Sequence, residues 1–191
     1  MRSNLLRHCL SFAPVALAAA LASGAAAENK QLLLGGYEQS LRLMEQGECA
    51  RAQDKLFPAG QPHAGDAVQV TDLGSCYLRA ANKMSEPEAE RYREIGAGWI
   101  LIAANAGERR AQEEAVRLYL DGKVFMVDPY EAGKWYALWK ANRTQLSFGQ
   151  VEFDADLVKQ MSGFTQEIWG EADARAKRWH PISLRSSQNA P

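Results

Sequence analysis

Three cysteines are the side chains of this sequence best suited to covalent chemistry. Cys9 lies near the start of the chain, whereas Cys49 and Cys76 lie farther along. If the protein is exported and its first residues are removed, Cys9 is lost and Cys49 and Cys76 remain. Two cysteines in a compartment that oxidises thiols favour a disulfide bond. The bridge would close a loop of about 27 residues and, in the chain-entropy model, stabilise the fold by about 3.5 kcal/mol. The alternative is a pair of buried free thiols.

The other residue types that carry out catalysis or bind metals form no recognised motif. His63 lies in a Gly/Pro-containing stretch and His180 near the C-terminus, and there is no Cys-x-x-Cys or His-Glu-x-x-His motif. Gly-x-Ser-x-Gly, Ser-x-x-Lys and glycine-rich phosphate loops are also missing. The acidic residues, such as Glu90 and Glu94, alternate with basic ones, which is typical of a solvated helix face. The sequence therefore predicts no catalytic residue, no metal site and no cofactor, and hence a protein that is not an enzyme.

Residues 1–27 have the three-part pattern of a secretory signal peptide. Arg2 and Arg7 form a basic start, residues 10–21 are apolar, and Ala25–Ala27 offers a small-residue cleavage site. The alternative is a membrane anchor. It is disfavoured because polar residues and a proline interrupt the stretch, whose apolar part is shorter than the roughly 20 residues that a span needs.

Cleavage of this segment makes the chain more acidic. The full sequence has 22 Lys and Arg against 23 Asp and Glu, a formal charge of −1. Cleavage leaves 20 basic residues against the same 23 acidic ones, a charge of −3. Such a charge gives no electrostatic reason to bind nucleic acid or anionic lipid. No later stretch is apolar for long enough to cross a membrane.

The rest of the chain has the 3.6-residue spacing of apolar residues that predicts α-helices. Ser85-Glu86-Pro87-Glu88 marks a helix start, with Ser85 as the predicted N-cap and Glu88 as the capping-box glutamate. Asp128-Pro129 marks another start, and Gly122, which suits a left-handed conformation, marks a helix end. The predicted helices are 30–46, 49–57, 67–83, 86–105, 109–121, 129–142 and one long helix over 154–179. Together they form a helical domain over 28–180, followed by a flexible tail over 181–191.

These helices are predicted to repeat in pairs. Trp99 and Trp135 lie 36 residues apart, and each falls on the core-facing side of the second helix of a pair. A fixed period in helix pairs is typical of an α-solenoid, in which each hairpin buries its apolar face against its neighbours. We therefore expect an all-α fold of stacked helical hairpins.

At these positions the chain resembles the Sel-one-like repeat family, which is related to tetratricopeptide repeats. The residues that carry the resemblance are Ala111-Gln112, Leu118-Tyr119, Gly122, Asp128, Ala132 and Trp135-Tyr136. The resemblance implies a short right-handed α-solenoid of stacked helical hairpins, closed by the long helix 154–179 as a C-terminal cap. The residues expected in the repeat core are Trp99, Ala111, Leu118, Gly122, Ala132, Trp135 and Trp139.

Two departures from the family pattern bear on binding. Where the family has a glycine in the loop within a unit, this chain has Val124, followed by apolar residues up to Val127. This apolar loop tip could dock a partner; alternatively, Phe125 and Val127 tuck between the helices. The bulky Trp139 stands where the family prefers alanine, which implies that helix 154–179 covers it in place of another unit.

Aromatic residues near this loop could line a groove between hairpins, although each of them also suits a structural role. The candidate partner-binding residues are Tyr119, Phe125, Met126, Tyr130 and Tyr136.

The expected function is that of a non-catalytic, periplasmic interaction protein. The resemblance implies an adaptor or regulator that binds a protein or peptide, for example in envelope signalling or surface-polysaccharide control, and we expect a monomer. Two alternatives stay open: an envelope enzyme that acts on cell-wall or β-lactam substrates, and an assembly factor for other exported proteins. The missing Ser-x-x-Lys motif and the scarcity of histidine disfavour the enzyme.

The signal-peptide pattern makes a direct prediction. The exported protein is expected to begin at or near Glu28, because the small-residue cleavage site ends at Ala27. The intact mass of the protein recovered from the periplasm tests this, and a mass that still includes residues 10–21 would contradict it.

Overall fold

The computed structural model describes residues 36–58, 67–143, 152–182 and 184, and the regular elements within these ranges are all α-helices. The all-α prediction is therefore confirmed for this part of the chain. The predicted signal peptide, residues 1–27, and most of the predicted tail lie outside the described residues. Among the described residues, no helix combines the length and the apolarity that a membrane crossing needs.

Most helix bounds agree with the prediction to within a few residues. A first helix covers residues 36–45, and its predicted start lies outside the described part of the chain. The others are α2 (Cys49–Leu56), α3 (Ala67–Ala81), α4 (Glu88–Asn105), α5 (Arg109–Asp121), α6 (Pro129–Ala141), α7 (Ala155–Met161) and α8 (Gln166–Arg178).

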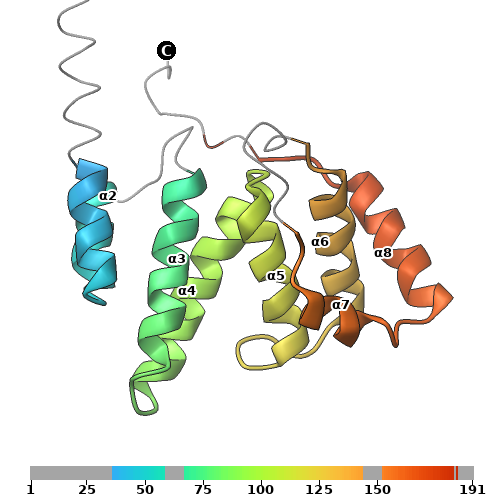
Figure 1. Cartoon of the computed structure of the whole chain (residues 1–191), viewed down its shortest axis with the longest axis horizontal. Helices are drawn as coiled ribbons and strands as arrows, with labels where there is room; N and C mark the ends of the chain where they lie inside the picture. Colours follow the sequence, from blue (N-terminus) through green and yellow to red (C-terminus); the bar gives the residue numbers. More distant parts are fainter. Residues whose placement is uncertain (1–35, 59–66, 144–151, 183, 185–191) are drawn as a thin grey trace, which may run out of the picture.

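Helices that follow one another in the chain also lie side by side. From α2 at one end through α6 to α8 at the other, the row keeps the order of the sequence, and α7 lies outside this order (Figure 1). The main contacts join α3 to α4, α4 to α5, α5 to α6 and α6 to α8, with smaller contacts between α2 and α3 and between α5 and α7. From α2 to α6, each helix therefore packs mostly against its neighbours in sequence.

Local caps explain why α6 begins and α5 ends where predicted. The Asp128 carboxylate accepts hydrogen bonds from the backbone N–H groups of Tyr130 and Glu131, at 2.9 and 3.0 Å, and Pro129 occupies the first helical turn. Gly122 ends α5 with a φ of 68°, a conformation that few side chains tolerate.

The predicted cap of α4 was wrong in its residue. The helix begins at Glu88, and Pro87 at its N-cap has no side chain that can accept a hydrogen bond. The carboxylate of Glu86 accepts from the backbone N–H of Glu90 instead, at 2.9 Å. The acidic residue next to Ser85 thus supplies the acceptor that was expected from the serine.

The long helix predicted over 154–179 was also wrong, because the chain folds there as two helices. Asp154 caps α7, and Thr165 caps α8 by accepting from the backbone N–H of Ile168 at 3.3 Å. Gly163 lies in the turn between them. The two parts pack on different partners, α7 on α5 and α8 on α6, which a single straight helix could not do.

The predicted repeat-core positions differ in burial. The fully or almost fully buried ones are Ala111, Leu118, Ala132 and Trp135. Trp99 and Trp139 are only half-buried. Trp139 was expected beneath the long helix, but its ring is covered by Phe153, which precedes α7, and by the guanidinium of Arg109, 4.0 Å from the ring centre.

The segment after α8 returns to the end of α4. The indole Nε1–H of Trp179 donates to Oδ1 of Asn105 at 3.2 Å, and the backbone N–H of Ile182 donates to the Asn105 carbonyl at 2.8 Å. This segment therefore connects the last helix to a helix in the middle of the row.

Two glycines set the close contact between α3 and α4. A Cβ atom placed on Gly74 would lie 2.9 Å from the carbonyl oxygen of Gly96, and the reverse distance is also 2.9 Å. A Cβ on Gly96 would in addition meet the backbone nitrogen of Leu78 at 3.0 Å. Because backbone atoms cannot swing away as side chains do, the two helices can approach this closely only with glycine at both positions.

This contact predicts opposite effects for two neighbouring glycines of α4. Gly96→Ala is expected to lower the free energy of unfolding by about 1–3 kcal/mol, because the new methyl group clashes with the α3 backbone. Gly98→Ala is the matched control: a Cβ there meets nothing within 4 Å, so better helix propensity should raise the stability by about 0.5–1 kcal/mol. Urea unfolding of both variants measures this, and equal effects would contradict the close contact.

Candidate functional site

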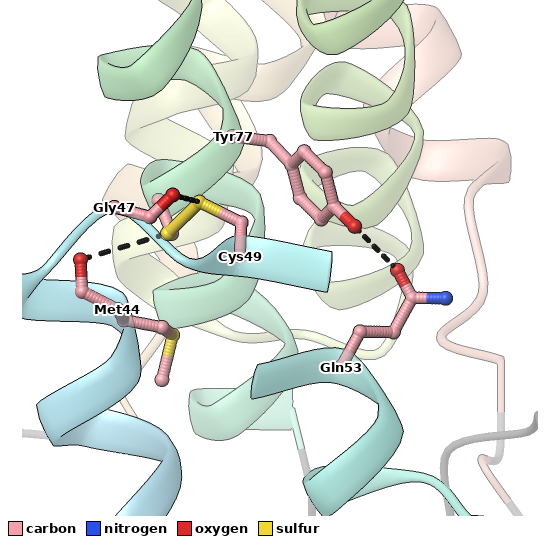
Figure 2. The surroundings of a disulfide bond; sticks show 6 residues. Met44, Gly47, Cys49, Gln53 and Tyr77 are labelled. Atoms are coloured by element: carbon pink, nitrogen blue, oxygen red, sulfur yellow. Dashed lines mark hydrogen bonds between the residues drawn. A yellow bond between two sulfur atoms is a disulfide. The ribbon is translucent and has the colours of Figure 1, made fainter. Parts of the chain in front are cut away.

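A disulfide bond joins the first hairpin to α3, as predicted. Cys49 begins α2 and Cys76 lies inside α3, with Cα atoms 5.8 Å apart, an ordinary spacing for a bridge. Figure 2 shows the two sulfur atoms beside the backbone carbonyls of Met44 and Gly47. These distances, 3.6 and 3.5 Å, are close contacts and not hydrogen bonds, because a disulfide sulfur carries no proton.

Side chains on α2 and in the turn after it strengthen the same junction. The hydroxyl of Tyr77 donates to Oε1 of Gln53 at 2.9 Å (Figure 2). Burial raises the pKa of Tyr77, so its hydroxyl stays protonated and remains a donor at neutral pH. Phe57, just past the end of α2, stacks on Trp99 of α4 with ring centres 5.6 Å apart. Contacts on both α3 and α4 therefore hold α2 in place.

Polar contacts determine how α5 lies against α3. The Glu108 carboxylate, 5% exposed, accepts the backbone N–H of Ala111 at 2.6 Å and thereby caps α5. The same carboxylate accepts the hydroxyl of Thr71 on α3 at 2.9 Å. Next to it, Arg110 forms an ion pair with Asp72 of α3 at 2.9 Å. One end of α5 is thus bonded to the first half of α3.

At the other end of α3, two hollows open on either side of the helix. One, of about 320 Å³, lies between α3, α4 and α5; the other, of about 470 Å³, lies between α3 and the first helix. Both are lined by Arg79 and Asn82, and we call them together the Arg79 groove. Its other residues include Met44, Glu45, Ser75, Cys76, Leu78, Lys83, Met84, Arg93, Glu114, Arg117, Leu118, Asp121, Lys123 and Val124.

Several charged side chains of this groove are already neutralised by neighbours. Arg93 pairs with Glu86, and Arg117 pairs with Asp154 at 2.9 Å. The hydrogen bond from each guanidinium holds the pKa of its carboxylate partner below the usual range, so both pairs persist at mildly acidic pH. Lys123 lies 3.6 Å from Asp121.

Three polar side chains of the groove remain open to a ligand. Arg79, Asn82 and Lys83 are all exposed, and they form no ion pair or side-chain hydrogen bond within the described part of the chain. A guanidinium and an ammonium supply donors and positive charge, and a carboxamide supplies both a donor and an acceptor. The groove can therefore bind a polar or acidic group without first breaking an internal contact.

The predicted partner-binding residues lie elsewhere. Tyr119 stacks on Phe125 with ring centres 5.1 Å apart, so Phe125 is packed and does not form a free loop tip. Met126 and Val127 are exposed, at 90% and 59%. The loop thus divides between the two alternatives: Phe125 tucks in, whereas the next two residues face solvent.

The two remaining candidates face the C-terminal helices. Tyr130 lies beside Arg175 of α8, with the guanidinium carbon 5.4 Å from the ring centre. Tyr136 packs in an aromatic cluster with Trp139, Phe153 and Trp169, at ring-centre distances of 4.9–6.3 Å. The five candidates do not come together in one site, and none of them lines the Arg79 groove.

Sequence reasoning missed the residues that form the groove. Ser75, Arg79 and Asn82 follow one another at helical spacing, so they lie on one face at the end of α3. That polar face was a usable signal, although nothing in the sequence showed which helix would lie opposite it. Among the residues that the structure describes, no group of three or more His, Cys, Asp or Glu side chains could hold a metal ion.

Comparisons of the chain with protein-family models, with curated proteins and with solved structures found no match.

The disulfide prediction can be tested with an internal control. The double variant Cys49→Ala/Cys76→Ala is expected to lose about 2–4 kcal/mol of unfolding free energy, the range for native bridges. Dithiothreitol should lower the stability of the unmodified protein by a similar amount and leave that of the double variant unchanged. Peptide mapping without reductant that recovers both thiols free would contradict the bridge.

Proposed function

We propose that this chain is a periplasmic, non-catalytic interaction protein that uses the Arg79 groove to bind a segment of another protein. The observation that carries the proposal is the groove itself. It lies between helices that the Cys49–Cys76 bond and the Glu108 contacts fix to α3. It presents three polar side chains that have no partner within the described residues.

The fold that we propose is a short right-handed α-solenoid of helical hairpins, with α8 as the cap of its last hairpin. The contacts between helices adjacent in sequence support this arrangement, because solenoid units pack mainly on their neighbours. In such an array the first helices of successive hairpins form one face, and residues 36–45, α3 and α5 supply most of the lining of the two hollows, to which α4 adds Arg93. Binding on that face leaves the hairpin cores undisturbed.

Two features support the periplasmic compartment that we propose. Residues 1–27 have a signal-peptide pattern, and Cys49 and Cys76 form a disulfide, which persists in oxidising compartments. An adaptor or regulator in envelope signalling or in surface-polysaccharide control is the role that the family resemblance implies.

Photo-crosslinking in the native periplasm tests the function. Benzoylphenylalanine replaces Glu45, an exposed residue of the second hollow, and in a matched control it replaces Lys177, an exposed residue of α8. We expect irradiation to give one discrete adduct from position 45 and none from position 177, because the partner covers only the groove. The same adducts from both positions, or none from position 45, would contradict binding at this surface.

A further inference from the structure

The Arg79 groove carries a net positive charge, whereas the whole chain carries a net negative one. Five cations and three carboxylates line it, but Arg93 and Arg117 pair with Glu86 and Asp154, which lie outside the lining. Arg117 also pairs with Glu114, and Lys123 pairs with Asp121. Among the described lining residues this leaves Arg79 and Lys83 against Glu45, an excess of one positive charge, although the whole chain has a formal charge of −1. A local excess of positive charge on an acidic protein attracts an acidic ligand to that place.

The excess is concentrated at the end of α3. Arg93, Arg117 and Lys123 form ion pairs with neighbouring carboxylates. Arg79 and Lys83 form none within the described ranges; Arg79 lies on α3 and lines both hollows, whereas Lys83 follows the end of α3 and lines only the second. Arg79 is therefore the open charge that a ligand in either hollow can reach.

The remaining groove surface is suited to a peptide. Leu78, Leu118 and Val124 line the first hollow, and Met44 and Met84 line the second, so apolar side chains can be buried on each side of Arg79. Asn82 lies between the hollows, and its carboxamide can donate to and accept from a peptide main chain. A uniform polyanion fits less well, because the three carboxylates of the groove would repel it.

From this arrangement we propose that the Arg79 groove binds an extended acidic segment of a partner protein. A carboxylate of that segment pairs with Arg79, its main chain bonds to Asn82, and flanking aliphatic side chains enter the two hollows. This inference rests on the proposed function and adds to it the chemistry of the partner.

Fluorescence anisotropy with defined probes tests the chemistry. The probes are short fluorescein-labelled peptides of alternating acidic and leucine residues, with matched peptides in which amides replace the carboxylates. We expect the acidic peptides to bind the mature protein, more weakly at higher salt. The amide peptides should bind at least about tenfold more weakly, because a hydrogen bond to a charged group contributes more than a neutral one. Equal binding of both sets would overturn the proposal.

Two variants of Arg79, with Arg91→Gln as a control, show whether Arg79 binds the acidic peptides. Arg79→Gln is expected to weaken binding of the acidic peptides about tenfold. Arg91→Gln, which changes another exposed arginine outside the groove, should leave it unchanged. Arg79→Glu should also turn the preference toward peptides with lysine in place of the acidic residues. Unchanged binding by both Arg79 variants, with unaltered circular dichroism, would overturn the assignment.

Competition and crosslinking separate the remaining outcomes. A uronic-acid oligosaccharide that displaces the peptide at equal concentration would overturn the choice of a protein segment, whereas failure to displace it supports that choice. The position-45 crosslink is then repeated with Arg79→Gln. Loss of the adduct supports the acidic segment. An undiminished adduct would refute it while leaving the interaction function intact.

Discussion

The buried carboxylate of Glu108 is the interaction on which the arrangement of the groove depends. It caps α5 through Ala111 and accepts the hydroxyl of Thr71 on α3, so one side chain fixes the start of one helix against the middle of another. A carboxylate that is 5% exposed needs such donors, because burying it without them is unfavourable. The requirement for donors therefore holds the start of α5 against the first half of α3, and α5 runs from there to the first hollow, which it lines with Glu114, Arg117 and Leu118.

Close apolar contacts and polar contacts contribute differently to the packing of the helices. In two places small residues allow helices to approach closely: Gly74 faces Gly96 between α3 and α4. Gly133 plays the same part between α6 and α8, where a Cβ would lie 2.8 Å from that of Ala172. Between α3 and α5, polar side chains determine the position, as Glu108 does. Close apolar contacts hold helices together, whereas polar contacts have directions and so fix how one helix is turned against the other.

How far the sequence predicted the structure depended on whether the cause was local. Asp128 and Gly122 act on their own helix ends, and both ends were predicted. The division at Gly163 was missed because the apolar spacing continues across it. Gly163 and the capping Thr165 mark the break locally, but the packing of the two parts on different helices depends on distant residues. The groove was missed for a similar reason: Thr71 and Glu108 are 37 residues apart, and their contact brings Arg79 opposite α5. Most of the aromatic residues predicted to bind a partner instead pack against other rings.

The return of the chain from Trp179 and Ile182 to Asn105 affects the stiffness of the molecule. A row of helices that contact only their neighbours can bend at every junction between helices. Here the bonds to Asn105 close a ring through α4, α5, α6 and α8, and a closed ring cannot bend at one junction without breaking a bond elsewhere. Changes of curvature from α4 to α8 should therefore be small, and at the other end of the row the Cys49–Cys76 bond restricts the junction of the first hairpin with α3. Both halves of the groove, beside Met44 and beside Leu118, should then keep their shape when a ligand binds.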